Sequence, residues 1–241
     1  MSQLRLDQAI ASRGLANSRT QAESYIRLGL VQVNGQIQTK ALIRVLDSDE
    51  IRITAAEQYV SRAGLKLASV ANDFGIEFKD KIVLDIGSST GGFTDFSIKH
   101  GAKKVIAVEV GSNQLHQSLK GNSLIELHEQ TDIRDFKTPK DRIDLILIDV
   151  SFISLKLVLP SVYKLSDDQT KIIAMFKPQF EADSKLKNQG IIKNDHIRRD
   201  LIKDFEKWLK LSNFYTIRSL DSKISGTKGN LETFFLLKKT L

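Results

Sequence analysis

The sequence contains no cysteine and only four histidines, and both shortages narrow the chemistry that it can support. Without cysteine the chain has neither a disulfide framework nor a thiolate metal site. The histidines stand far apart, at positions 100, 116, 128 and 196, without the spacing of metal ligands, so we expect no bound metal. Low-complexity segments are absent as well. A hydrophobic content of 41% suffices for a folded core, which argues against disorder.

Long apolar runs are also missing. The longest, such as Leu145–Ile148 and Ile172–Phe176, have the length of a strand and fall far short of the ~20 residues that cross a membrane. The residues that follow Met1 lack the apolar stretch of a secretory signal peptide. We therefore expect a cytoplasmic protein with no membrane partner. The sequence leaves the oligomeric state open, a monomer included.

Positive charge is in modest excess, with 36 Lys and Arg against 29 Asp and Glu and a net charge of +7. Such an excess suits a polyanionic partner, most often nucleic acid, although it could serve solubility alone. Residues 1–60 hold 7 basic and 6 acidic residues, whereas residues 61–241 hold 29 and 23. Net charge therefore does not single out the first segment as an RNA-binding unit, and only the placement of its arginines could do so.

Residues 1–58 are expected to form a small α+β unit that begins with two helices. Apolar residues at helical spacing cover Leu4–Ser12 and Ser18–Leu28. Ser18 is a suitable N-cap for the second helix, and Gly29 is a suitable stop.

Short strands are expected to follow these helices. The alternating segment Val31–Ile37 contains Asn34-Gly35, which is typical of a type I′ hairpin turn. Ile43–Leu46 and Glu50–Ile53 then complete a small sheet. A unit of this size holds little core, so we expect it to lean on the rest of the chain through a short ordered connector over residues 54–60.

Helical and strand patterns alternate from residue 59 to residue 241. Seven apolar runs have the length of a strand: Ile82–Ile86, Val105–Val110, Leu124–Leu127, Ile143–Ile148, Lys171–Phe176, Tyr215–Leu220 and Glu232–Leu237. Helical spacing lies between most of them, as in Ala63–Phe74, Gly92–His100 and His196–Leu211. This order predicts an α/β fold with a seven-stranded, doubly wound, Rossmann-like sheet, mostly parallel, whose last two strands pair like a hairpin. The arrangement is that of S-adenosylmethionine (SAM) methyltransferases.

A glycine-rich turn follows the first of these strands. A phosphate-binding P-loop would need Lys after the last glycine, but Phe93 follows Gly92, and a dinucleotide fingerprint would need glycine where Ser89 stands. Asp-x-Gly-x-x-x-Gly-Gly is instead the form seen in SAM methyltransferases, although a turn without a ligand remains an alternative. The candidate cofactor residues here are Asp85, Gly87, Ser88, Thr90, Gly91, Gly92 and Phe93.

Further cofactor contacts are expected after the next two strands. Glu109 stands 24 residues after Asp85, where an acidic residue usually binds ribose hydroxyls, and Val110 follows it. Asp132, followed by Ile133, could accept a hydrogen bond from the adenine amino group.

Asp149 and Lys177 each follow a very apolar strand, and ligands of open α/β sheets bind beyond the carboxyl ends of strands. Lys66 and Glu232 are further candidates for this site. Each residue also has a structural interpretation, since Lys177 could reach solvent, Asp149 could cap a helix and Glu232 could be a surface residue. Methyltransferases acting on base amino groups carry prolines after the aspartate, where Asp149-Val-Ser-Phe152 has none, and carbon methylation usually needs cysteine. An oxygen nucleophile activated by lysine remains.

Several long motifs together resemble the TlyA, or haemolysin A-like, family. In the first segment they are Arg5-Leu-Asp7, Arg13-Gly-Leu15, Ser18-Arg19 and Gly29-Leu-Val-Gln-Val-Asn-Gly35. In the second they are Tyr59-Val-Ser-Arg-Ala-Gly-Leu-Lys-Leu67, Leu84–Asp95, Asp149–Leu155 and Phe176-Lys-Pro-Gln-Phe-Glu181. The resemblance implies an S4 RNA-binding domain over residues 1–58 and an FtsJ-type SAM methyltransferase domain over residues 59–241.

The resemblance further implies methylation of a ribose 2′-OH in ribosomal RNA, with cytidine as the expected nucleotide. The catalytic tetrad would be Lys66, Asp149, Lys177 and Glu232, with Lys177 as the base. Ribosomal RNA or ribosomal subunits are the expected partners. The candidate RNA-binding residues are Arg5, Arg13, Arg19, Arg27 and Arg62, joined by Lys185, Lys187 and Lys193 near the catalytic mouth. A non-catalytic RNA-binding factor, a base methyltransferase and a cytolysin remain alternatives.

Overall fold

The structure is a computed structural model that describes residues 3–54, 58–183, 191–192, 194–224, 226 and 229–240. The predicted RNA-binding lysines Lys185, Lys187 and Lys193, and residues 55–57 of the predicted connector, lie outside the described residues. Within the described part of the chain, no helix combines the length and the apolar character needed to cross a membrane.

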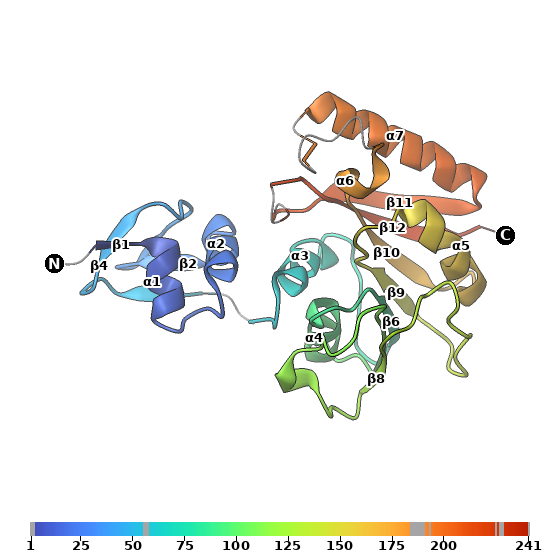
Figure 1. Ribbon diagram of the computed structural model, residues 1–241, viewed down its shortest axis with the longest axis horizontal. Coiled ribbons are helices and arrows are strands. Elements are labelled where there is room, and N and C mark those ends of the chain that lie inside the picture. The colour runs from blue at the N-terminus through green and yellow to red at the C-terminus, as the bar shows by residue number, and fades with distance from the viewer. Residues whose placement is uncertain are drawn as a thin grey trace.

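The N-terminal unit, blue in Figure 1, contains two helices and two small sheets. Its elements are β1 (Gln3–Arg5), α1 (Leu6–Ser12), α2 (Arg19–Arg27), β2 (Val31–Val33), β3 (Gln36–Ile37), β4 (Arg44–Leu46) and β5 (Ile51–Ile53). The Ser18 hydroxyl caps α2 by accepting a hydrogen bond from the Gln21 amide, as predicted. Asn34 and Gly35 both have positive φ, at 50° and 79°, which confirms the predicted hairpin turn.

One prediction for this unit was wrong. Leu4 lies in a strand rather than at the start of a helix, and α1 begins only at Leu6. The reason is a long-range pairing, because β1 runs antiparallel to β4 with Leu4 opposite Val45. The local apolar spacing favours a helix at Leu4, but pairing with a strand some forty residues further along the sequence determines its conformation. As a consequence β4 does not join β2 and β3, and only β5 does.

The larger part of the chain forms the predicted seven-stranded sheet in the order β11-β12-β10-β9-β6-β7-β8. Its strands are β6 (Ile82–Ile86), β7 (Lys104–Val108), β8 (Ile125–His128), β9 (Leu145–Ile148), β10 (Lys171–Phe176), β11 (Phe214–Asp221) and β12 (Thr233–Lys239). All neighbours are parallel except that β12 is antiparallel to both β10 and β11. The carboxyl ends of β6, β7, β9 and β10 therefore share one edge of the sheet.

Helices cover both faces of this sheet (Figure 1). They are α3 (Arg62–Ala71), α4 (Gly92–Lys99), α5 (Leu155–Leu165), α6 (Pro178–Glu181) and α7 (Asp195–Leu211), with a 3-10 turn at Gln117–Leu119. Val83 and Leu147 belong to the core with α3 and α4, whereas Leu84 and Ile146 belong to the core with α5 and α7. Successive strand residues thus bury opposite faces, which explains the continuous apolar runs in the sequence.

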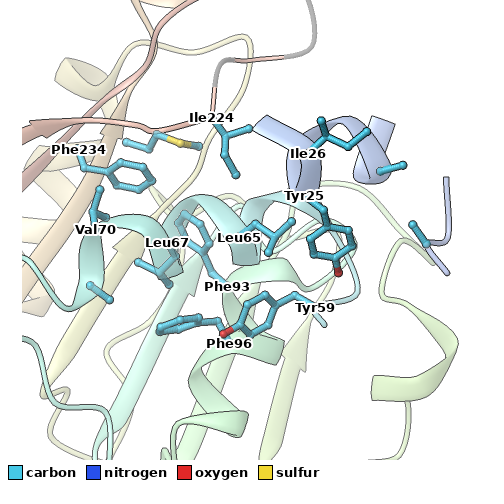
Figure 2. Close-up of a cluster of buried hydrophobic side chains, with 14 of the residues drawn as sticks. Tyr25, Ile26, Tyr59, Leu65, Leu67, Val70, Phe93, Phe96, Ile224 and Phe234 are labelled. Carbon is cyan, nitrogen blue, oxygen red and sulfur yellow. The ribbon is translucent and has the colours of Figure 1, made fainter. Parts of the chain in front are cut away.

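The N-terminal unit shares a core with the larger domain. Tyr25 and Ile26 of α2 lie beside Leu65 of α3 and Ile224 in one cluster of buried side chains (Figure 2). The Gln21 side chain also donates a hydrogen bond of 2.9 Å to the backbone carbonyl of Tyr59. The small unit therefore completes its core against the larger domain.

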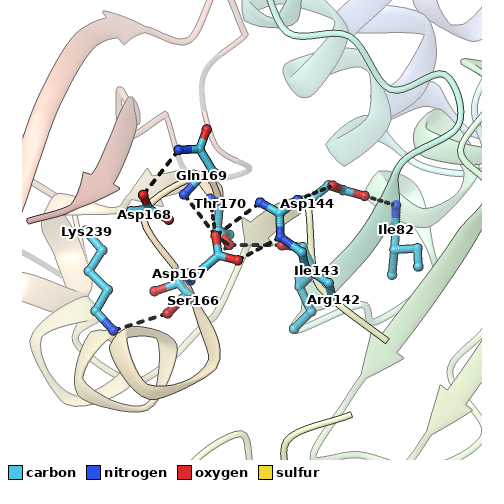
Figure 3. A network of polar contacts seen from close by, with 10 residues as sticks. All are labelled: Ile82, Arg142, Ile143, Asp144, Ser166, Asp167, Asp168, Gln169, Thr170 and Lys239. Atoms are coloured by element: carbon cyan, nitrogen blue, oxygen red, sulfur yellow. Dashed lines mark hydrogen bonds and ion pairs between the residues drawn. The ribbon is translucent and has the colours of Figure 1, made fainter. Parts of the chain in front are cut away.

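A polar network fixes the amino ends of the central strands (Figure 3). Arg142 donates to the Asp167 carboxylate over 2.7 Å, and this bond is the main reason that the pKa of Asp167 lies below its usual range. The Thr170 hydroxyl donates to the carbonyl of Ile143, and Asp144 accepts from the amide of Ile82. These contacts belong to the end of the sheet opposite the predicted site.

Candidate active site

The turn between β6 and α4 requires glycine at two positions because atoms of other segments approach it closely. A Cβ at Gly87, where φ is +79°, would lie 2.7 Å from the Asp149 carbonyl oxygen. A Cβ at Gly92 would lie 2.2 Å from Ser61 Oγ, just before α3. Both distances are far below van der Waals contact. The glycine pattern found in the sequence therefore lets three segments of the chain meet beneath one turn.

A cavity of about 460 Å³ opens beside this turn, beyond the carboxyl ends of β6, β7 and β9. Six of the predicted cofactor residues line it: Gly87, Glu109, Val110, Asp132, Ile133 and Asp149. Its wall also includes residues that sequence reasoning missed, among them Gln114, Thr131, Val150, Ser151 and Phe152. A cavity with an apolar lining and a few carboxylates suits a nucleoside.

Two of the three acidic residues that line this cavity, Glu109 and Asp132, are held in place by hydrogen bonds. Glu109 accepts from the amides of Ser89 and Gly111, at 2.9 and 2.7 Å, so it ties the glycine turn to the end of β7. Asp132 forms a two-point ion pair with Arg134, and the hydrogen bond from that arginine lowers the pKa of Asp132. Both carboxylates are therefore fixed in position before any ligand arrives.

A smaller cavity of about 90 Å³ lies under the glycine turn. Its lining includes the predicted residues Asp85, Ser88, Thr90 and Gly92. Gly87 and Asp149 line this cavity as well as the larger one, and Ser61 is a lining residue that sequence reasoning missed. Phe93 also borders it, but its ring packs in the core against Phe234, 6.3 Å between centroids. Gly91 does not line either cavity, since its Cα faces Leu115 and Leu119.

Several buried polar atoms around the smaller cavity have no hydrogen-bond partner among the described residues: Ser61 Oγ, Asp85 Oδ1 and Ser88 Oγ. Ser61 occupies the N-cap position of α3 yet its side chain does not cap that helix. Burial raises the pKa of the Asp85 carboxyl to about 7. Buried polar groups without partners are costly, so this cluster fits a ligand with hydrogen-bond donors, such as the ammonium group of an amino acid.

The four predicted catalytic residues form two ion pairs. Lys177 Nζ lies 2.6 Å from Asp149 Oδ1, and Lys66 Nζ lies 2.5 Å from Glu232 Oε2. Lys177 also donates to the Ser151 hydroxyl over 3.0 Å. Because Phe176 is paired with Thr233, the same register places Lys177 opposite Glu232. The Lys177–Asp149 and Lys66–Glu232 ion pairs therefore lie close together, beyond the carboxyl end of β10.

Phe152 is a feature of this site that sequence reasoning did not single out. Its side chain is 91% exposed, and its φ of +65° is rare for a bulky residue. Its ring lies 5.1 Å from that of Phe180, and Lys177 Nζ lies 5.8 Å from the Phe180 ring. Strained backbone at an exposed aromatic residue is a common feature of ligand-binding sites. The only signal in the sequence was an aromatic residue soon after Asp149.

The predicted RNA-binding arginines differ in their surroundings. Arg5 and Arg19 both form ion pairs with the buried Asp7, at 2.9 and 3.0 Å. Arg13 donates to the backbone carbonyls of Leu46 and Asp49. These three side chains therefore have structural partners within the N-terminal unit.

Arg27 and Arg62 both line one small cavity between the N-terminal unit and the larger domain. No group of three or more His, Cys, Asp and Glu side chains suited to a metal ion occurs within the described ranges.

Comparisons with known proteins cover nearly the whole chain. Residues 59–239 match the family described as FtsJ-like methyltransferase, and residues 4–51 match the S4 domain. Hemolysin A of Brachyspira hyodysenteriae is 37% identical over 95% of this chain and 97% of its own length. The 23S rRNA (cytidine-2′-O)-methyltransferase TlyA of Campylobacter jejuni is 43% identical over 75% of this chain and 71% of its own. A solved hemolysin-named structure from Streptococcus thermophilus has a TM-score of 0.74 at 34% identity, covering 100% of this chain and 90% of the other.

Proposed function

The chain belongs to the FtsJ-like methyltransferase family, and we propose that it methylates a ribose 2′-OH of ribosomal RNA, with cytidine as the target nucleotide. The observation that carries the proposal is the Lys177–Asp149 ion pair at the edge of a nucleoside-sized cavity. The relative in Campylobacter jejuni, which is named for this reaction, supports the choice of ribose and of cytidine.

The cofactor of this family is SAM, and the residues present fit it. The larger cavity would take the adenosine part, with Glu109 near the ribose and Asp132 near the base. The smaller cavity would take the amino-acid part, because Asp85, Ser88 and Ser61 hold polar atoms there that have no partner in the described part of the chain. Bound SAM supplies an electrophilic methyl group.

The protein residues would then position and deprotonate the ribose. In its neutral amine form, after its ammonium proton has left to solvent, Lys177 Nζ would accept the proton of the 2′-OH, as general bases do when held within hydrogen-bond reach. Asp149 and Ser151 orient Lys177 through the contacts already described. The Lys66–Glu232 pair is buried beside it and would hold the ribose on its other side. Positioning supplies much of the rate in such a reaction.

The exposed Phe152 ring packs against Phe180, and the Phe180 ring in turn lies near Lys177 Nζ. At this position the Phe152 ring could stack on the base of the target nucleotide. We propose that residues 1–58 bind RNA and that residues 59–241 perform the chemistry. The ribosomal subunit would then be the partner and the cytoplasm the place of action.

The test uses purified protein, SAM and unmodified ribosomal subunits, followed by digestion of the RNA and mass analysis of its nucleosides. Lys177→Ala should lower turnover by about 10²–10⁴-fold, the usual contribution of a general base, and leave SAM binding intact. Lys171→Ala is the matched control. Lys171 is the first residue of β10 and Lys177 follows its last residue, so the two lysines lie at opposite ends of that strand. Its activity should equal that of the wild type.

The products separate the alternatives. New 2′-O-methylcytidine made by the wild type and by Lys171→Ala, but not by Lys177→Ala, would support the proposal. A base-methylated nucleoside would overturn the lysine mechanism. Binding to subunits without SAM binding or product would favour a non-catalytic RNA-binding factor. Lysis of liposomes by the purified protein would favour a cytolysin.

A further inference from the structure

The smaller cavity under the glycine turn is rich in carboxyl groups. Asp85 and Asp149 both line it, and Asp85 is fully buried near the carboxyl end of β6. Asp85 is paired with Ala107 of β7 and with Leu147 of β9, and those two strands are followed by Glu109 and Asp149. The negative charges of both residues raise the pKa of Asp85. Three carboxyl groups therefore meet under one turn.

The positive charges on the elements around Asp85 have carboxylates of their own. Three lysines each form an ion pair elsewhere, namely Lys177 with Asp149, Lys66 of α3 with Glu232, and Lys99 of α4 with Asp95. Arg62, at the start of α3, is acted on by the charges of Glu232 and Glu23. The excess of negative charge beside Asp85 therefore favours a cationic ligand.

Only one oxygen of Asp85 has a hydrogen-bond partner in the described part of the chain. Its Oδ2 accepts a hydrogen bond of 2.6 Å from the Thr94 hydroxyl, whereas Oδ1 accepts none. Burial is the main reason that the pKa of this carboxyl is raised to about 7, so in slightly acidic solution the group holds a proton. An ammonium group carries one positive charge and three N–H donors, which is what Oδ1 lacks.

We propose that Asp85 releases its proton to solvent when SAM binds, and that its carboxylate becomes the counter-ion of the cofactor's ammonium group. The O–H bond of the carboxyl breaks, water takes the proton, and Oδ1 accepts an N–H from the ammonium group. The inference rests on the proposed function, because it takes the amino-acid part of SAM to occupy the smaller cavity. Affinity for SAM therefore falls as the solution becomes more acidic.

The test is isothermal titration calorimetry of the full chain with SAM at pH 6, in cacodylate and in bis-Tris, two buffers with different enthalpies of ionisation. At this pH the amino group of free SAM is already protonated, because α-amino groups titrate at about pH 8. The difference between the two heats should correspond to release of about 0.9 proton per SAM, and affinity should rise about 5-fold from pH 6 to pH 7. Binding without proton release at pH 6 would overturn the proposal.

A second ligand tests whether the ammonium group is responsible. 5′-Methylthioadenosine has the nucleoside and the sulfur of SAM but no amino-acid part, so it should bind without releasing a proton. Equal proton release by the two ligands would overturn the proposal, because the ammonium group would then play no part.

Asp85→Asn keeps the shape of the side chain and removes its charge. The variant should bind SAM about 10–100-fold more weakly at pH 7, the effect of one lost charged hydrogen bond, and should release no proton. Its affinity should not rise between pH 6 and pH 7. Asp80→Asn is the matched control, because Asp80 is an exposed aspartate just before the other end of the same strand. It should bind SAM and release a proton as the wild type does.

Thr94→Val removes the hydroxyl that opposes the raised pKa of Asp85. The rise of SAM affinity with pH should therefore move to higher pH than in the wild type. A merely structural role for these two side chains would instead lower the affinity by the same factor at every pH, and would overturn the proposal. Thermal unfolding of each variant checks that a lost affinity does not come from a lost fold.

Cofactor binding and methylation are read separately in these measurements. If SAM binds with proton release but no 2′-O-methyl product forms on ribosomal subunits, the role of Asp85 stands and the proposed reaction fails. If the product forms while SAM binds without proton release, the reaction stands and the role of Asp85 fails.

Discussion

Among single residues, Asp85 shows how far burial can change a carboxyl group. It is fully buried at the end of β6, and its Oδ2 accepts a hydrogen bond of 2.6 Å from the Thr94 hydroxyl. Burial raises its pKa to about 7, and the charges of Asp149 and Glu109 add to this, while the Thr94 hydroxyl opposes it. Near neutral pH the folded protein therefore carries a carboxyl group that resists ionisation.

This raised pKa predicts a pH-dependent stability. In the unfolded chain the same carboxyl ionises near pH ~3.9, so between about pH 4 and 7 the unfolded state releases its proton first and the fold loses stability as pH rises. Asp85→Asn removes that loss. Relative to the wild type, the variant should gain more free energy of unfolding at pH 8 than at pH 5, measured by urea unfolding. Glu77→Gln, at an exposed position, is the control, and an equal pH dependence in Asp85→Asn and the wild type would contradict the argument.

Single residues also show what could be predicted from the sequence. Asp149 and Lys177 could be identified because each directly follows an apolar strand, and strand ends share an edge. Ser61 and Phe152 could not, because their roles depend on packing across the chain. Ser61 matters through its approach to Gly92, and Phe152 through a backbone angle that no pattern of residue types reveals. The partners of Arg5 and Arg19 likewise depend on the burial of Asp7.

At the scale of elements, the loop between β9 and α5 is held by the short helix α6. Glu181 accepts a hydrogen bond from the Ser154 hydroxyl at 2.5 Å and from the Leu155 amide at 2.7 Å. The carboxylate thus sits at the N-terminus of α5, where negative charge is favourable. Since α6 directly follows Lys177, the same clamp fixes the loop that carries Ser151 and Phe152 against the proposed base.

Glu181→Ala should therefore affect both stability and catalysis. Loss of the two contacts should lower the free energy of unfolding by about 1–2 kcal/mol, the usual cost of losing a helix cap. Because the loop would no longer be fixed, kcat should fall more than the apparent affinity for RNA changes. Denaturant unfolding and steady-state kinetics measure the two effects. Glu77→Ala should change neither, and a Glu181→Ala protein with full kcat would show that the clamp serves stability alone.

Elements were predictable where their patterns are local. The buried parallel strands carry continuous apolar runs, and the caps and turns at Ser18, Asn34 and Gly35 carry their own residue signals. Strand β1 was missed because three residues contain too little pattern and its partner β4 lies far along the chain. Strand ends also differed slightly, as β7 ends at Val108 and leaves Glu109 and the exposed Val110 beyond the sheet.

At the scale of the whole molecule, the two domains share one cluster of buried side chains. Tyr25 belongs to this cluster and lies near Leu65 and Tyr59 (Figure 2), and its ring is fully buried. Its hydroxyl has no hydrogen-bond partner among the described residues, and burial raises its pKa to about 12. A shared core implies that the N-terminal unit and the catalytic domain unfold together.

Tyr25→Phe tests this junction because it removes only the buried hydroxyl. An unpaired buried polar group costs about 1–3 kcal/mol, so the variant should be more stable than the wild type by a similar amount. The difference should grow above pH ~10, because there the unfolded tyrosine ionises while the buried one cannot, which costs the wild type stability. Urea unfolding at pH 7 and at pH 10.5, followed by probes in each domain, measures both effects. If the domains form one cooperative unit, both probes should shift together, whereas a shift of the N-terminal probe alone would show that the shared core does not couple them.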